Sequence, residues 1–96
     1  YITMRVRTTG HCNCRSCAGK LAGCMTASGK RPRAKHTIAV DKRLIPLGTK
    51  VKIGKIIYTA EDTGGAIKGK RIDVYYSSHR QASAHGVKYR KIKVYI

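Results

Sequence analysis

Residues 61–75 read Glu61-Asp62-Thr63-Gly64-Gly65-Ala66-Ile67-Lys68-Gly69-Lys70-Arg71-Ile72-Asp73-Val74-Tyr75. Two aspartates, Asp62 and Asp73, flank a loop with three glycines. Because glycine permits backbone conformations and close approaches that side chains block, the loop can turn the chain back and set Asp73 beside Asp62. Two adjacent carboxyl groups raise the pKa of one of them, which suits a general acid near neutral pH. The stretch therefore predicts a carboxylate pair with an acid–base role.

Alternating apolar and polar residues predict strands along most of the chain. In the strand after the glycine loop, Ile72 and Val74 share one face, while Asp73 and Tyr75 share the other. Ser78, three residues before Gln81, predicts the start of a short helix that Gly86 ends. Strands are predicted over residues 2–7, 37–40, 50–53, 56–60, 71–76 and 89–96. Six short strands and one or two short helices predict an all-β fold, closed into a six-stranded barrel.

The composition limits both the size of the protein and its partners. The chain has 96 residues, 21 Lys and Arg against 4 Asp and Glu, and a formal net charge of +17. We expect one domain over residues 1–96, no membrane span and an anionic partner, because so large a charge attracts polyanions. All four acids lie within residues 41–73, which indicates that they pair locally or act chemically.

Five segments, in order, carry a resemblance to a known family. They are Thr26-Ala27-Ser28-Gly29, Ile38-Ala39-Val40-Asp41, Ile45-Pro46-Leu47-Gly48-Thr49, residues 61–69 and residues 71–75. The chain resembles the three-aspartate, or 3D, domain. That family is related to the catalytic domain of membrane-bound lytic transglycosylase A and, more loosely, to rare lipoprotein A and the expansins. The resemblance implies a double-psi β-barrel.

The resemblance also implies an activity. Lytic transglycosylases cleave the β-1,4 bond between N-acetylmuramic acid and N-acetylglucosamine in peptidoglycan without water and leave a 1,6-anhydro end. By position, Asp73 matches the catalytic general acid/base, Asp62 its supporting partner and Asp41 the third aspartate of the catalytic set. The implied substrate-binding residues are Thr26, Ser28, Thr63, Gly64, Gly65 and Ala66. Tyr75 joins them because it shares a strand face with Asp73. No cofactor is implied for catalysis.

Two other functions fit the same residues. A basic barrel could bind the cell wall without cleaving it, or it could bind nucleic acid, although no aromatic recognition motif is present. Peptidoglycan strands are the expected partner, and anionic wall polymers are a further one. We expect an extracellular or cell-wall location, as a module of a larger secreted or phage protein. Loss of cleavage in an Asp73→Asn variant with retained wall affinity would separate the enzyme from the binding module.

A cysteine cluster precedes the first of these segments. Its spacing is C-x-C-x2-C-x6-C, formed by Cys12, Cys14, Cys17 and Cys24. Four thiolates could hold a structural zinc ion. Two disulfides would suit a secreted protein, although C-x-C is an awkward spacing for an internal bridge. Free thiols would suit a reducing habitat. The sequence predicts a structural role for this Cys-rich loop and leaves these three states open.

Overall fold

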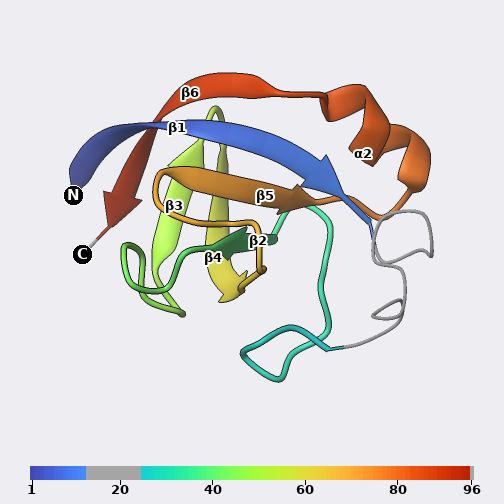
Figure 1. Ribbon diagram of the computed structural model, residues 1–96, viewed down its shortest axis with the longest axis horizontal. Helices are drawn as coiled ribbons and strands as arrows, with labels where there is room; N and C mark the ends of the chain where they lie inside the picture. Colours follow the sequence, from blue (N-terminus) through green and yellow to red (C-terminus); the bar gives the residue numbers. More distant parts are fainter. Residues whose placement is uncertain (13–24, 96) are drawn as a thin grey trace.

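The computed structural model describes residues 1–12 and 25–95. Six strands and one helix follow each other along this part of the chain (Figure 1). They are β1 (Ile2–His11), β2 (Thr37–Val40), β3 (Lys50–Ile53), β4 (Ile56–Asp62), β5 (Arg71–Tyr75), α2 (His79–His85) and β6 (Lys88–Tyr95). None of the described helices is both long and apolar enough to cross a membrane.

The described strands close into a barrel in the order β1-β5-β2-β4-β3-β6. Two neighbouring pairs, β1 with β5 and β2 with β4, are parallel, and the other four pairs are antiparallel. The last strand, β6, completes the ring by pairing with both β1 and β3. The prediction of a closed six-stranded β-barrel with a short helix is confirmed.

The inner face of the barrel holds a core of aliphatic side chains. Ile38 and Val40 of β2 are completely buried there, and they face Val74 and Ile72 across the β2–β5 ladder. The predicted alternation along β5 is confirmed, because Ile72 and Val74 are buried and the other three residues of the strand are only half-buried. The remaining core residues are Val6, Ile45, Val51, Ile53, Tyr58, Ala60, Ile92 and Val94. Ile2, expected on the same face as Val6, is instead exposed at the start of β1.

Helix α2 closes one end of the molecule against β1. Its N-terminal cap is Ser78, whose Oγ accepts a hydrogen bond from the backbone N–H of Gln81, and its C-terminal cap is Gly86. The helix packs closely because Gly10 has no side chain: a Cβ there would lie 2.7 Å from the carbonyl oxygen of Ala82 and 2.8 Å from Cβ of His85. The predicted helix is confirmed, and Gly10 is what lets it approach the barrel.

A buried polar network fixes the helix further. The Thr8 hydroxyl donates to the carbonyl oxygen of Lys88 at 3.0 Å, so it must accept from Nε2 of His85, also at 3.0 Å. His85 is thus the Nε2–H tautomer, and its Nδ1 accepts from the Tyr76 hydroxyl at 2.6 Å. Burial and the nearby Lys88 and Arg90 lower the pKa of His85 below its ordinary value of 6.5. The neutral ring therefore joins β1, α2 and the start of β6.

Two strands continue well beyond their predicted ends. β1 continues to His11, beyond the predicted end at residue 7, and β4 continues to Asp62, beyond the predicted end at residue 60. Both extensions have the same cause, which is pairing with a distant strand: β1 follows β5 from Arg7 to His11, and β4 follows β2 as far as Asp62. Three residues of the candidate site, Thr9, His11 and Asp62, lie on these extensions.

Candidate active site

Strand register brings the two aspartates to either side of one small residue. Ala39 of β2 pairs with Asp73 of β5 on one side and with Asp62 of β4 on the other. The two aspartate Cα atoms are thus two strand spacings apart, about 10 Å. Because cross-strand partners share a face of the sheet, both aspartate side chains lie on the same face as Ala39, away from the core. The sequence predicted Asp73 directly beside Asp62, whereas in the structure strand β2 lies between them.

A β-bulge is what turns Asp62 toward this face. Regular pairing from Thr37–Thr59 and Ile38–Ala60 would set Glu61 opposite Ala39, but the register shifts there and Asp62 takes that place. A bulge adds one residue to a strand and re-aims the side chains that follow it. Without it, Asp62 would point toward the barrel core. Alternation along a regular strand would put Glu61 and Asp62 on opposite faces, and the bulge removes that alternation.

Asp73 is held by two residues of β1. The Thr9 hydroxyl donates to its Oδ1 at 2.9 Å, and Nδ1 of His11 lies 3.2 Å from its Oδ2. The latter is a close approach without hydrogen-bond geometry, which becomes an ion pair only when the His11 ring is protonated. The Asp73 side chain is 20% exposed, so solvent and a ligand can reach it. The His11 ring packs edge-on against Tyr75, with ring centres 5.6 Å apart. The sequence reasoning had not connected His11 with Asp73.

Asp62 is fixed by backbone donors and stays half-buried. Its Oδ1 accepts from the backbone N–H of Thr63 at 2.8 Å and from that of Ala27 at 3.0 Å. Oδ2 accepts none of the hydrogen bonds found among residues 1–12 and 25–95, so it remains available to a ligand. The backbone N–H of Ser28 also bonds to the carbonyl oxygen of Glu61, at 3.0 Å. The segment with the predicted residues Thr26 and Ser28 thus lies against the end of β4.

Asp41 has a different setting. Its Oδ2 accepts from the backbone N–H of Gly69 at 2.9 Å, and its Oδ1 accepts from the backbone N–H of Arg43 at 3.1 Å. The side chain is only 9% exposed. These two bonds, with a lesser contribution from the Arg43 guanidinium, lower the pKa of Asp41 from 3.8 to about 2. The carboxylate joins the turn after β2 to the far end of the glycine-rich loop, which is a structural task.

We expect Asp41 to make the protein sensitive to acid. A carboxyl whose pKa is lower when folded stabilises the fold fully above its unfolded pKa, about 3.9, and loses this contribution as the pH falls toward 2. The free energy of unfolding, measured with urea between pH 5 and pH 2, should therefore fall more steeply for the wild type than for Asp41→Asn. Parallel curves for the two proteins would contradict the assignment.

A pocket of about 530 Å³ has Thr63, the residue after Asp62, in its wall. It lies between the turn after β2 and the glycine-rich loop, and its lining residues are Val40, Asp41, Lys42, Arg43, Thr63, Gly64, Gly65, Ile67 and Lys68. Three of the predicted substrate-binding residues, Thr63, Gly64 and Gly65, are among them, whereas Ala66 is exposed outside the lining. The pocket is large enough to accept part of a small ligand.

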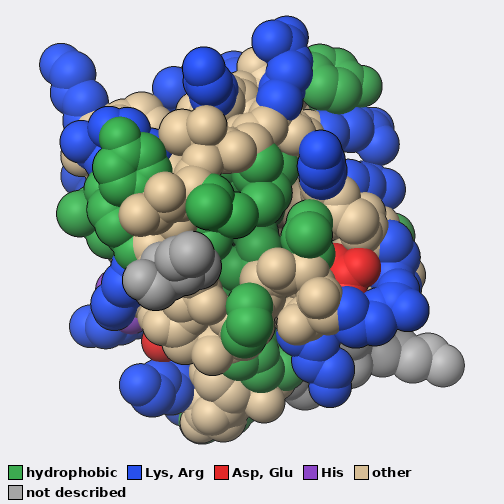
Figure 2. Space-filling model, turned by 90° about the vertical axis from the view of Figure 1, so that its left-hand side faces the viewer, with side chains coloured by type: hydrophobic (Ala, Val, Ile, Leu, Met, Phe, Trp, Pro, Cys, Tyr) green, Lys and Arg blue, Asp and Glu red, His purple; other side chains and the backbone are tan. Residues whose placement is uncertain are grey.

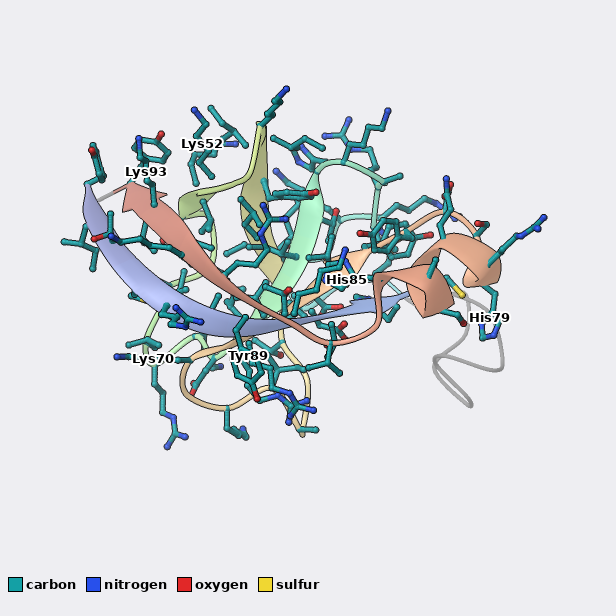
Figure 3. All side chains as sticks on the ribbon, turned by 90° about the horizontal axis from the view of Figure 1, so that it is seen from above. Lys52, Lys70, His79, His85, Tyr89 and Lys93 are labelled. Atoms are coloured by element: carbon teal, nitrogen blue, oxygen red, sulfur yellow. The ribbon has the colours of Figure 1, made fainter. Side chains whose placement is uncertain are left out.

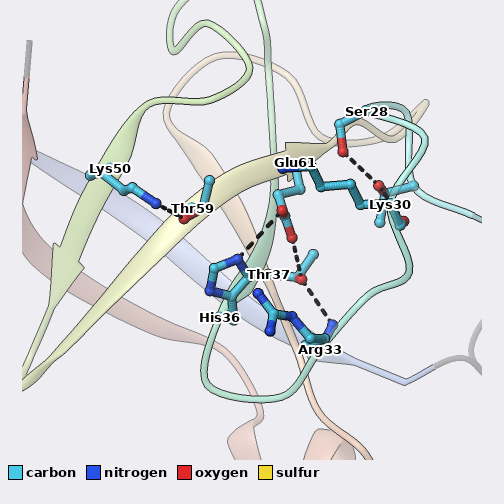
Figure 4. Close-up of polar contacts among 9 residues, drawn as sticks. Ser28, Lys30, Arg33, His36, Thr37, Lys50, Thr59 and Glu61 are labelled. Carbon is cyan, nitrogen blue, oxygen red and sulfur yellow. Dashed lines mark hydrogen bonds and ion pairs between the residues drawn. The ribbon is translucent and has the colours of Figure 1, made fainter.

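Glu61 belongs to a separate buried cluster of polar side chains. It is 3% exposed, its Oε1 accepts from the Thr37 hydroxyl at 2.7 Å, and its Oε2 lies 3.4 Å from Nε2 of His36 (Figure 4). Thr37 in turn accepts from the backbone N–H of Arg33 at 2.9 Å. This cluster ties the segment before β2 to β4, so Glu61 supports the loop that holds Asp62.

Most of the cysteine cluster lies outside the described residues. Cys12 is buried at the end of β1, with its Sγ 3.9 Å from Nδ1 of His79, while Cys14, Cys17 and Cys24 are not described. Within residues 1–12 and 25–95, no three His, Cys, Asp or Glu side chains gather as metal ligands. The zinc, disulfide and thiol alternatives stay predictions.

The chain is similar in sequence to two proteins of Bacillus subtilis. The cell wall-binding protein YocH of Bacillus subtilis is 51% identical over 79% of the chain, and the putative cell wall shaping protein YabE of the same organism is 41% identical over 95%. The chain spans only 28% and 22% of the lengths of these two relatives.

The solved structure of MltA from Escherichia coli, described as a lytic transglycosylase fold, matches 72% of the chain and 26% of its own length, with 25% identity and a TM-score of 0.60. The 3D domain model matches residues 36–96, which include Asp41, Asp62 and Asp73. Because that match covers more than half of the chain, this protein belongs to the 3D domain family.

Proposed function

We propose that this domain cleaves peptidoglycan glycan strands as a lytic transglycosylase, with Asp73 as general acid and base. The observation that carries the proposal is the pairing of Asp73 and Asp62 with Ala39, which puts a solvent-accessible carboxyl group and a second one on the same face of the sheet. The likeness to MltA supports the proposal. Further support for the reaction comes from Asp62 and Asp73, the residues expected to act, which share one face of the sheet.

The proposed reaction needs one carboxyl group that first gives and then takes a proton. Protonated Asp73 donates its proton to the glycosidic oxygen as the bond to the anomeric carbon breaks. The resulting carboxylate then accepts the proton of the muramic C6 hydroxyl, whose oxygen closes the 1,6-anhydro ring. Positioned proton transfer of this kind contributes a factor of about 10²–10⁴ to the rate. Thr9 holds Oδ1 of Asp73, which leaves Oδ2 on the side of His11 for this work.

Asp62 and the pocket beside it would position the sugar. Oδ2 of Asp62 is available to a sugar hydroxyl, and the next residue along the chain, Thr63, lines the pocket together with Gly64 and Gly65. Glycines at that wall let a ligand approach the backbone closely. Tyr75, half-buried on the same face as Asp73, offers its ring to a neighbouring sugar. Asp41 is left out of the chemistry and keeps the loop in place.

Digestion of purified peptidoglycan sacculi tests the proposal. We expect the domain to release soluble muropeptides whose masses correspond to 1,6-anhydromuramic ends, measured by liquid chromatography and mass spectrometry. Reducing ends would mean hydrolysis instead. Retention of the domain on sacculi without any release would overturn cleavage and favour the second candidate, a wall-binding module. The name of its relative YocH, a cell wall-binding protein, is the observation that favours this candidate.

A further inference from the structure

Strands β1, β3 and β6 carry no acid, and cations lie opposite each other on their outer face. Across the β1–β6 ladder Arg5 pairs with Lys91, and across the β3–β6 ladder Lys52 pairs with Lys93. Their sequence neighbours Val6, Val51, Ile92 and Val94 are buried inside, so these four cations point outward. Arg5, Lys52, Lys91 and Lys93 are called the cationic face below.

This arrangement costs folding free energy. Like charges directly opposite each other on neighbouring strands repel and destabilise a sheet. None of the ion pairs among residues 1–12 and 25–95 involves the cationic face, since they join His11, His36 and Arg43 to acids. The chain therefore keeps four close positive charges that the fold itself does not need, which indicates that they serve binding.

The barrel divides its charges by strand. All four acids lie on β4, on β5 or directly after β2, which are neighbours in the ring, whereas β3, β6 and β1 form the other half and carry no acid. Figure 3 shows the labelled Lys52 and Lys93 side by side, and Lys70 and Tyr89 on the other side of that view. Figure 2 shows the side of the molecule that lies on the left in Figure 1. Lys and Arg side chains crowd the rim of this side, and very little acidic surface is visible on it.

The spacing of the cationic face suits a repeating anion. Charges opposite each other are about 5 Å apart at the backbone, and charges two residues apart along β6 are about 7 Å apart. Exposed aromatic rings extend the face at its end, where Nζ of Lys93 lies 5.0 Å from the ring centre of Tyr1, and Tyr1 meets Tyr95 edge-on at 5.8 Å. One face of Tyr1 is thus already occupied by Lys93, which makes it a poor platform for a stacked base.

We propose that the cationic face binds a linear phosphodiester polymer of the bacterial cell wall. Charge complementarity supports a polyphosphate ligand, and the wall-related names of the two relatives favour a wall polymer over nucleic acid. The cationic face lies on β1, β3 and β6, the strands that carry no acid. Binding there needs no cleavage, and it would hold the domain on the wall whether or not glycan strands are cut.

The test is binding of a fluorescent glycerol-phosphate oligomer of defined length, followed by anisotropy over a range of NaCl concentrations. One variant replaces the whole cationic face: Arg5→Gln, Lys52→Gln, Lys91→Gln and Lys93→Gln. The control has the same net charge but loses four exposed cations elsewhere: Arg31→Gln, Lys35→Gln, Lys70→Gln and Arg80→Gln. Melting temperatures of both variants show that each is folded.

We expect the face variant to bind the oligomer about 10²-fold more weakly at physiological salt, with a log–log salt slope flatter by about 3, because each lost phosphate contact contributes about 0.7. The control should lose much less affinity, and its salt slope should stay much closer to that of the wild type. Equal losses in the two variants would overturn the proposal, since net charge alone would then explain binding. Tighter binding of a single-stranded DNA oligomer with the same number of phosphates would replace the wall polymer by nucleic acid.

Discussion

An Asp73→Asn variant is expected to lose glycan cleavage about 10³-fold while its affinity for sacculi is unchanged. Asparagine has nearly the same shape and can still accept the Thr9 hydrogen bond, but it can neither donate a carboxylic proton nor accept one from a C6 hydroxyl. The rate of anhydro-muropeptide release is the measurement. Binding of the variant to sacculi, measured by cosedimentation, serves as the internal control because the proposed wall contacts lie elsewhere.

Asp62→Asn is the matched comparison for this experiment. It keeps an acceptor for the backbone N–H groups of Ala27 and Thr63, but it removes the charge and replaces Oδ2 by an NH2 group. We expect a smaller loss of cleavage than for Asp73→Asn, since Asp62 positions the sugar and does not transfer the proton. Equal losses would give the two carboxyl groups equal parts in the chemistry, and full activity of Asp73→Asn would remove Asp73 from it.

A Gly10→Ala variant is expected to lose about 2 kcal/mol of stability and to melt roughly 10 °C lower. The added Cβ would lie 2.7 Å from the Ala82 carbonyl oxygen and 2.8 Å from Cβ of His85, so α2 must move away from β1. That movement strains the hydrogen bonds of His85 with Thr8 and Tyr76. Thermal unfolding followed by circular dichroism measures the effect.

Gly65→Ala provides the control for Gly10→Ala. A Cβ at Gly65 meets nothing within 4 Å, and its backbone does not need a positive φ. Its melting temperature should stay close to that of the wild type. Equal melting temperatures for both variants would show that α2 does not depend on close contact at Gly10. Gly10→Ala would also disturb the candidate site, because Gly10 lies between Thr9 and His11, the two residues that contact Asp73.

The sequence predicted well those elements that local pattern defines. The β3–β4 hairpin forms at Gly54-Lys55, where Gly54 has φ +63°, and the Ser78 cap and Gly86 delimit the helix. Along β5, alternation correctly placed Asp73 on the face opposite to the core. In each case the cause lies within a few residues, so it can be read from the sequence alone.

The features that the sequence did not predict depend on residues far apart in the chain. The bulge at the end of β4 exists because β4 pairs with β2, and no local pattern marks Glu61 as the extra residue. His11 meets Asp73 only because β1 extends alongside β5. Likewise, the bond from Gly69 to Asp41 spans 28 residues and gives that aspartate a structural task. The sequence resemblance grouped all three aspartates. In the fold, Asp62 and Asp73 pair with Ala39, whereas Asp41 bonds to Gly69.

The position of β6 has a consequence for how the chain is made. It lies between β1 and β3, with Ile2 opposite Val94 and Lys50 opposite Tyr95, so the ring is complete only when the final strand is in place. During synthesis, a nascent chain that has reached only α2 leaves both β1 and β3 with unpaired backbone groups open to other chains. Assembly of this domain must therefore wait until residues 88–95 have left the ribosome.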